Sequence, residues 1–133
     1  MRDEDKSNEE EQDEYRKAGF TRQNESFWAS CYQLYVALPK RHEAQILGGQ
    51  ILRSGTSVGA HYREACRAKS DADFISKIEG GLQELDETVY WAELIGEAGI
   101  FSEKRLRPLC DEAEELIAMF VTMVKNEKDR KTR

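Results

Sequence analysis

Residues 50–95, QILRSGTSVGAHYREACRAKSDADFISKIEGGLQELDETVYWAELI, decide the fold of this chain. Apolar residues recur at intervals of three and four on both sides of Ser70, which predicts two amphipathic helices with Ser70 as the N-cap of the second. The first of these helices also carries polar residues where a plain helical bundle would have Leu or Ile: Arg53, Ser54, Ser57, His61 and Glu64. Each polar group left unpaired on a packing face costs about 1–3 kcal/mol, so the fold must supply partners for them.

Similar periodicity on either side of this stretch predicts two more helices. Pro39 ends a helix over about residues 21–38, because the residue before a proline disfavours the helical region. The helices of the central stretch cover about 43–68 and 71–97, and Gly99 suits a left-handed terminator. Ser102 starts the last segment, in which an interior proline at Pro108 would be costly, so we expect a short turn and a regular helix that restarts near Pro108.

The apolar stripes of these helices predict which residues are buried. Residues 78, 82, 85, 89, 92 and 95 form the expected core stripe of the third helix, and residues 109, 113, 116, 120 and 123 that of the fourth. Glycines at 48, 49, 55 and 59 favour close approach of a neighbouring backbone or a local bend, or are simply tolerated. Four helices with short turns indicate an all-α fold, an antiparallel up-down-up-down four-helix bundle.

The domain organisation follows the charge distribution. Residues 1–18 carry eight acids and four bases, a net charge of −4. We therefore expect residues 1–17 to be an acidic disordered tail, or frayed helix that leads into the bundle. The bundle occupies residues 18–125, and residues 126–133 form a frayed basic C-terminus.

Composition limits the classes of function. The net charge of the 133 residues is −6, which argues against nonspecific attraction to nucleic acid. The sequence contains neither a membrane-spanning run nor the apolar segment of a signal peptide, so no membrane partner is expected. Three widely spaced cysteines indicate reduced thiols and a cytoplasmic location.

Catalysis and cofactor binding find little support in the sequence. A dimetal bundle needs a Glu-x-x-His motif on each of two helices, whereas His61-x-x-Glu64 has the reverse order and occurs once. The cysteines lack the spacing of a zinc site. We therefore predict a protein that is not an enzyme and has no cofactor. Arg53, Ser57, His61 and Glu64 are assigned to a polar core or a subunit contact, and Arg53 and Glu64 are expected to be buried with charged or backbone partners.

A basic cluster at the end of the second helix has two interpretations. Arg63, Arg67 and Lys69 either provide ordinary capping and solubility, or contact an anionic partner such as RNA or an acidic protein. Aromatic residues at helical spacing indicate core or interface positions, and Trp and Tyr are favoured at subunit contacts. The residues concerned are Tyr62, Tyr90, Trp91 and Phe101.

An ordered set of motifs gives a family resemblance. The motifs are Leu38-Pro39-Lys40, Gln50-x-x-Arg53-Ser54-x-x-Ser57-Val58-Gly59, Arg63-Glu64-Ala65, Ser70-x-x-Asp73-Phe74-x-x-Lys77, Leu85-Asp86-Glu87-Thr88-x-Tyr90-Trp91-x-Glu93-Leu94 and Glu114-Glu115-Leu116. Over about residues 27–125 the chain resembles the four-helix-bundle family of the 23S rRNA intervening-sequence protein, also called the S23 family.

The resemblance implies an up-down four-helix bundle that assembles with itself as a ring, commonly a homopentamer, and most similar proteins have no established activity. Some similar proteins are accessory proteins of diversity-generating retroelements, which bind the reverse transcriptase and nucleic acid. The chain departs from the pattern in its acidic charge and at His61, where the family often has Asn. We expect an oligomeric interaction protein, with association with RNA or with a nucleic-acid-processing protein as the alternative.

Overall fold

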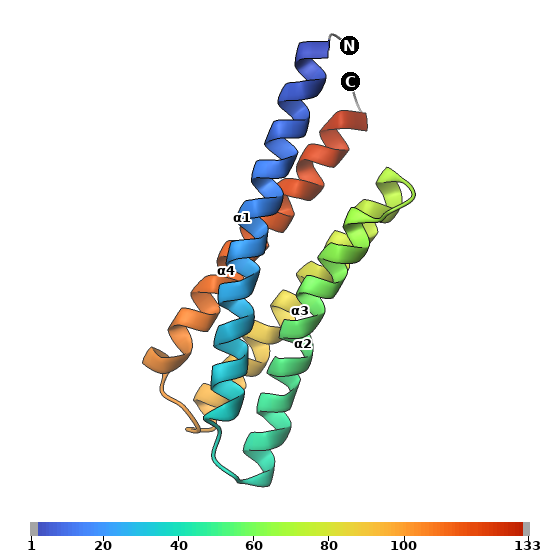
Figure 1. The fold of residues 1–133 in the computed structure, drawn as a ribbon. Helices are drawn as coiled ribbons and strands as arrows, with labels where there is room; N and C mark the ends of the chain where they lie inside the picture. Colours follow the sequence, from blue (N-terminus) through green and yellow to red (C-terminus); the bar gives the residue numbers. More distant parts are fainter. Residues whose placement is uncertain (1–2, 132–133) are drawn as a thin grey trace.

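The computed structural model describes residues 3–131, which form four helices in an up-down-up-down arrangement (Figure 1). Helix α1 comprises Asp3–Val36, α2 His42–Cys66, α3 Asp71–Glu97 and α4 Glu103–Lys131. Helices α1 and α3 each pack against both α2 and α4, so the four helices form a square in cross-section. The predicted all-α four-helix bundle is confirmed.

Local hydrogen bonds at the turns explain where the helices begin and end. The Oγ of Ser70 accepts a hydrogen bond from the backbone N–H of Asp73 at 3.1 Å, which caps α3 as predicted. Gly99 has φ +70°, the left-handed conformation expected after α3. The Oγ of Ser102 accepts from the N–H of Arg105 at 3.2 Å and caps α4. Side-chain chemistry in the sequence therefore sets the boundaries of α3 and α4.

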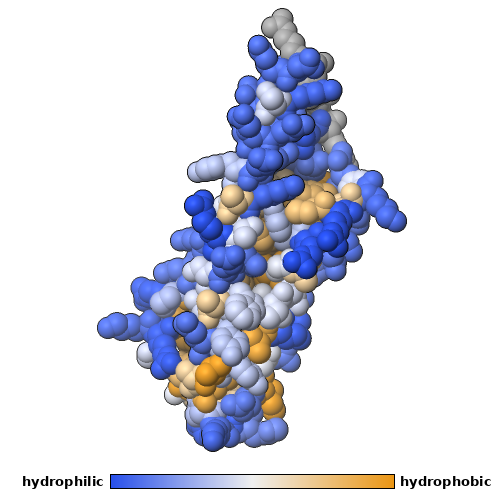
Figure 2. Space-filling view, viewed as in Figure 1, coloured by the Kyte–Doolittle hydropathy of each residue, from blue (hydrophilic) through white to orange (hydrophobic). Residues whose placement is uncertain are grey.

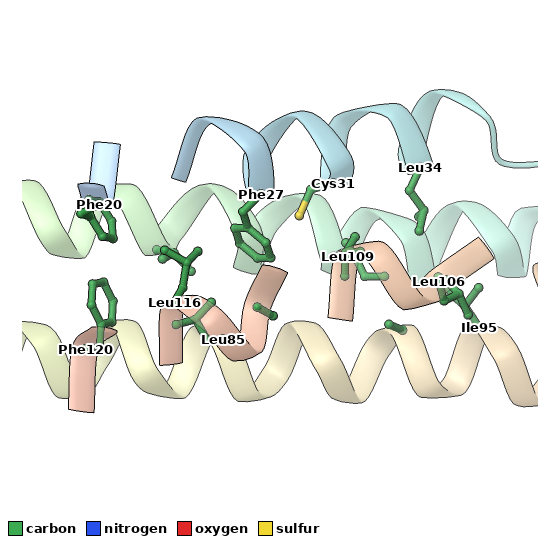
Figure 3. Packing of buried hydrophobic residues seen from close by; sticks show 14 of the residues in the cluster. Phe20, Phe27, Cys31, Leu34, Leu85, Ile95, Leu106, Leu109, Leu116 and Phe120 are labelled. Carbon is green, nitrogen blue, oxygen red and sulfur yellow. The ribbon is translucent and has the colours of Figure 1, made fainter. Parts of the chain in front are cut away.

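The core is a continuous column of apolar side chains between the four helices. Figure 3 shows Phe20 facing Phe120 at one end of this column and Leu106 beside Ile95 at the other. The rings of Phe20 and Phe120 are stacked with their centroids 5.3 Å apart. Buried positions of α3 include Gly81 and Thr88, whereas Leu82 and Val89 are only half-buried. The expected core stripe of α3 is therefore rotated slightly about the helix axis.

Glycines in α2 let side chains of α1 and of the turn that follows α1 approach closely. A Cβ atom at Gly55 would lie 2.7 Å from the Sγ of Cys31, and one at Gly48 would collide with Leu38. A close approach is therefore found at Gly48 and Gly55, but a side chain makes it in each case and not a neighbouring backbone as expected, and Gly49 has no neighbour within 4 Å. Burial raises the pKa of the Cys31 thiol to about 12, with Glu112 contributing, so this thiol is unreactive at neutral pH.

Residues 3–17 differ from the expected disordered tail, because they form the first half of α1. Buried Phe20 and Phe27 fix the helix, and each further residue can then be added at low cost. Acidic side chains in the first turn favour the positive end of the helix dipole. Residues 1–2 lie outside the described part of the chain.

The start of α4 also differs from the expectation. The helix is continuous from Glu103 and includes Pro108, rather than restarting near that proline. Pro108 is exposed, so water can reach the backbone carbonyl near the helix start that lacks its usual partner. Leu106 and Leu109 are buried on either side and hold this turn against the core. At the other end, α4 continues to Lys131, and residues 132–133 of the expected frayed end lie outside the described residues.

One end of the bundle is open. Residues 3–17 of α1 and 123–131 of α4 run together past the turn between α2 and α3 and stand apart from it (Figure 1). We call these two segments the arm. A groove of about 580 Å³ lies between the arm and the turn, and Tyr62, Phe74 and Met123 contribute its apolar lining.

Candidate interaction surface

Arg53 is the centre of a polar cluster on the outer side of α2 and α3. Its Nη2 atom lies 2.7 Å from Oε2 of Glu87, and its Nη1 atom lies 3.4 Å from Oε2 of Glu84. Its Nε–H donates to Oε1 of Gln50 at 2.9 Å. The hydrogen bond to Glu87 raises the pKa of Arg53 above its usual value. Three acceptors therefore hold the guanidinium in one orientation.

The sequence placed Arg53 and Glu64 correctly in one respect and wrongly in another. Each has a charged partner, as predicted, since Glu64 pairs with Lys77 of α3 at 3.5 Å. Neither is buried: the side chains of Arg53 and Glu64 are 49% and 55% exposed. Helical periodicity assigned them to a packing face, but they lie at its outer edge, where long side chains reach α3 along the surface.

Beneath this edge, two hydroxyl groups meet in the core. The Oγ of Ser54 and the Oγ1 of Thr88 are 2.7 Å apart, and both side chains are fully buried. Each hydroxyl also bonds to a carbonyl oxygen of its own helix, Ser54 to Gln50 at 2.9 Å and Thr88 to Glu84 at 2.8 Å. The polar position at Ser54 is thus compensated. Thr88 was missed as its partner, although its spacing between Leu85 and Ala92 was a usable signal.

Ser57 and His61 lie on the same side of α2. The Oγ–H of Ser57 donates to the backbone carbonyl of Arg53 at 2.8 Å. The ring of His61 covers Gly80 of α3, where an added Cβ would lie 2.7 Å from Cε1. The buried Nδ1 of His61 has no hydrogen-bond partner in the part of the chain that the structure describes. We call this band of polar residues on α2 and their partners on α3 the α2–α3 seam.

Exposed apolar side chains lie on the same two helices. Tyr90 of α3 and Ile46 of α2 are both about half exposed, and the ring of Tyr90 lies 5.2 Å from that of half-buried Trp91. Because Ser54 is opposite Thr88 and the helices are antiparallel, Ile46 and Trp91 belong to the same end of the seam. The sequence left core and interface positions open for Tyr90 and Trp91, and it gave no reason to expect Ile46 at the surface.

The basic cluster is separate from the seam. Arg63, Arg67 and Lys69 are exposed near the turn between α2 and α3. A carboxylate lies beside Lys69, whose backbone N–H donates to Oδ2 of Asp73 at 3.4 Å. The groove beside them is lined by five carboxylates and four basic groups: Glu9, Asp13, Asp71, Glu127, Asp129, Arg16, Lys17, Lys69 and Arg130. The field near the cluster is therefore mixed in sign.

Two kinds of feature are not found among the described residues. Within residues 3–131 no group of three His, Cys, Asp or Glu side chains is placed to hold a metal ion. Of the four helices described, none combines the length and apolarity needed to cross a bilayer.

Comparison with known proteins establishes the family. The sequence pattern of the 23S rRNA-intervening sequence protein family matches residues 16–122. The chain belongs to this family. It is also similar to the crystal structure of a protein with unknown function from the S23 ribosomal protein family of Bacteroides thetaiotaomicron, with 33% identity and a TM-score of 0.72. That similarity covers 77% of this chain and 95% of the other. No curated protein matches the chain.

The match to the 23S rRNA-intervening sequence protein family confirms the resemblance found in the motifs. It includes the whole α2–α3 seam and the basic cluster, but it begins at residue 16. Residues 3–15 of the arm therefore lie outside the matched region. The family description names no enzymatic activity.

Proposed function

We propose that this protein is a nonenzymatic interaction module that assembles with further copies of itself through the α2–α3 seam. Arg53 carries the proposal. It is a half-exposed arginine, already oriented by three acceptors, on the same two helices as exposed Tyr90 and Ile46. Arg, Tyr and Trp are the residues that most often dominate binding energy at protein interfaces.

The fixed geometry of the seam supports this role. An arginine that is free in solution loses side-chain entropy when a partner immobilises it, about 0.5–1.5 kcal/mol for a flexible side chain. Arg53 is already held by Glu84, Glu87 and Gln50, so much of its side-chain entropy is lost when the chain folds and not when a partner binds. Tyr90 and Ile46 add apolar surface that would be removed from water when two copies come into contact, which favours association.

The expected assembly is a ring, five copies being the number that the family resemblance implies. A ring requires a head-to-tail contact, in which the seam of one copy meets a different surface of the next copy. We place the module in the cytoplasm, because its three cysteines are unpaired and lie in α1, α2 and α4.

Light scattering after gel filtration tests the assembly. The full chain should be oligomeric at micromolar concentration, and Arg53→Ala combined with Tyr90→Ala should shift it towards the monomer. Arg107→Ala combined with Val121→Ala is the matched control, since both residues are exposed on α4 and Arg107 pairs only with Glu103 of its own helix in the described residues. A strict monomer for the unaltered chain would refute the proposal.

RNA association is the second candidate, favoured by the exposure of Arg63, Arg67 and Lys69. In this alternative the cluster contacts the phosphate backbone of RNA, or of an RNA bound to a processing protein. Binding of an RNA hairpin should fall steeply with salt and should weaken in Arg63→Ala/Arg67→Ala. Absence of binding at low salt would end this alternative without affecting the oligomer.

A further inference from the structure

A stripe along α1 combines carboxylates in its first half with aromatic rings in its second half. Glu10, Glu14, Glu25, Trp28 and Tyr32 follow a helical spacing that keeps them within an arc of about 60° on the continuous helix. All five side chains are exposed. We call this surface the α1 stripe, and it is distinct from the α2–α3 seam.

The aromatic half of the stripe exposes large apolar side chains to solvent. Trp28 is 45% exposed, Tyr32 49% and Val36, one turn further, 64%. The rings of Trp28 and Tyr32 are stacked, with centroids 5.3 Å apart and planes inclined by 17°. A contiguous apolar surface of this kind typically marks an interaction site.

The neighbouring surface of α2 extends the aromatic half. On α1, Ser30 points towards α4 through its hydrogen bond to Glu112, so Trp28 and Tyr32 lie on the opposite side, next to α2. At the matching height α2 presents Gly49, Leu52 and Thr56, which are uncharged, and a Cβ at Gly49 would meet nothing within 4 Å.

The view of α1 and α2 in Figure 2 shows the same division. The arm end is hydrophilic, whereas pale and orange residues gather over the lower half of the two helices. The α1 stripe thus continues from a charged surface at the arm end onto a largely apolar surface. We call the part of this surface on α2, formed by Gly49, Leu52 and Thr56, the shelf.

The three carboxylates of the first half are not neutralised by ion pairs within the described residues. Glu10, Glu14 and Glu25 form no ion pair within residues 3–131. Glu9 and Asp13 on the neighbouring face do pair, with Arg130 and Arg16. The net charge of −6 further favours a basic partner over nucleic acid.

We propose that the α1 stripe binds a basic amphipathic helix of another protein. The apolar face of that helix would cover Trp28, Tyr32 and the shelf of α2, while its Lys and Arg side chains would reach Glu10, Glu14 and Glu25. An amphipathic helix that lies on an apolar surface is a recurrent mode of peptide recognition. The distance from Glu14 to Tyr32 is about 27 Å along the helix, so a partner helix of about 20 residues would cover both halves.

A synthetic Leu/Lys peptide of about that length, patterned as an amphipathic helix, is the probe. Fluorescence anisotropy of the labelled peptide with the full chain should show saturable binding, and a Leu/Glu peptide of the same pattern should not bind. Trp28→Ala/Tyr32→Ala should weaken binding by about tenfold or more. Glu10→Gln/Glu14→Gln/Glu25→Gln should weaken it by about three- to tenfold at low salt and flatten its salt dependence.

Matched controls separate the stripe from general charge and apolarity. Glu97→Gln/Glu114→Gln/Glu115→Gln removes the same charge from exposed sites elsewhere, and Tyr15→Ala removes an exposed ring from another face of α1. Both should leave the affinity within about twofold. Equal losses in control and stripe variants, or no binding at low salt, would overturn the proposal.

The oligomeric state of the variants distinguishes this proposal from self-assembly through the seam. Trp28→Ala/Tyr32→Ala should retain the oligomeric state of the unaltered chain, with an unchanged circular dichroism spectrum. If this variant instead dissociates and keeps its peptide affinity, a second copy occupies the stripe and the proposal fails.

Discussion

The α2–α3 seam and the arm are both rich in polar residues, but they hold their helices together differently. At the seam, the hydroxyls of Ser54 and Thr88 are 2.7 Å apart in the buried core, and the Arg53 cluster lies outside them at the surface. In the arm, an ion pair between α1 and α4, Glu9 with Arg130, is 3.9 Å long and about half exposed. Burial decides how much a polar contact contributes to stability, so we expect the seam to fix the register of its helices and the arm to be held less tightly.

The junction between these regions offers the largest expected effect. Phe120 is fully buried and stacks on Phe20 directly below the arm. Phe120→Ala should lower the free energy of unfolding by about 3–5 kcal/mol, through lost burial and a cavity. Chemical denaturation measures this loss. Tyr15→Ala in the exposed arm is the control and should change stability by less than about 0.5 kcal/mol. Similar losses in both variants would show that the arm is packed as tightly as the core.

The hydroxyl pair tests the role of burial within the seam. Thr88→Val keeps the shape of the side chain but removes the partner of Ser54, and should cost about 1–2 kcal/mol. Thr122→Val is a matched control, because the Thr122 hydroxyl bonds to its own helix at Ala118 in the same way, at 2.9 Å, but is exposed. The control should lose less than about 0.5 kcal/mol.

A double-mutant cycle isolates the pair itself. Ser54→Ala, Thr88→Val and the double variant should be non-additive, with a coupling of about 0.5–1.5 kcal/mol. Strict additivity would mean that the two hydroxyls are satisfied independently by the carbonyls of Gln50 and Glu84, and the seam would then differ less from the arm than its geometry indicates.

The groove beside the arm predicts a pH dependence. Burial and a hydrogen bond with Asp71 raise the pKa of Glu127, although Arg130 opposes this shift. The folded state therefore binds the proton more tightly than the unfolded chain, and ionised Glu127 lowers stability at neutral pH. Glu127→Gln should be more stable than the unaltered chain at pH 7, by less than the loss expected for Thr88→Val.

The difference should vary with pH in a defined direction. It should vanish below about pH 4, where the carboxyl is protonated in both states, and should grow as the pH rises through the raised pKa of the folded state. Thermal unfolding across this range measures it, with Glu115→Gln, which removes an exposed carboxylate from the same helix, as the control. A gain that is largest in acid would contradict the assignment.

The helices themselves could be predicted from the sequence because periodicity and capping are local properties. Ser70, Gly99 and Ser102 set helix ends through bonds or angles within a few residues. The exposure of Arg53 could not be predicted, since it depends on how far α3 lies from the outer edge of α2. Periodicity also assigned Leu82 to the core in place of Gly81, because a slight rotation of the core stripe about the helix axis exchanges one of two neighbouring positions for the other.

The positions of neighbouring helices also decide the structure of the arm and the exposure of the candidate sites, so these could not be predicted from periodicity and composition. Residues 3–17 lack apolar residues for a core, so composition indicated a tail, but a helix already fixed at Phe20 extends through them. The α1 stripe was also invisible, because a Trp and a Tyr at helical spacing predict burial unless the position of the neighbouring helix is known. Which polar residues share a helix face could be predicted, whereas which surfaces remain free could not.

Removal of the arm ion pair between Glu9 and Arg130 has the smallest expected effect, and it tests the contrast between the arm and the seam directly. Glu9→Gln removes the cross-helix pair with Arg130, whose side chains are both about half exposed. Such a pair is screened by solvent and salt and costs side-chain entropy to form, so the loss in unfolding free energy should be at most about 0.5 kcal/mol and should disappear in high salt. Hydrogen exchange gives a second readout: amides of residues 5–13 should exchange faster in the variant, while those near Ser54 should keep their protection. Unchanged exchange in the arm would mean that the helical preference of α1, and not the contact with α4, keeps these residues ordered.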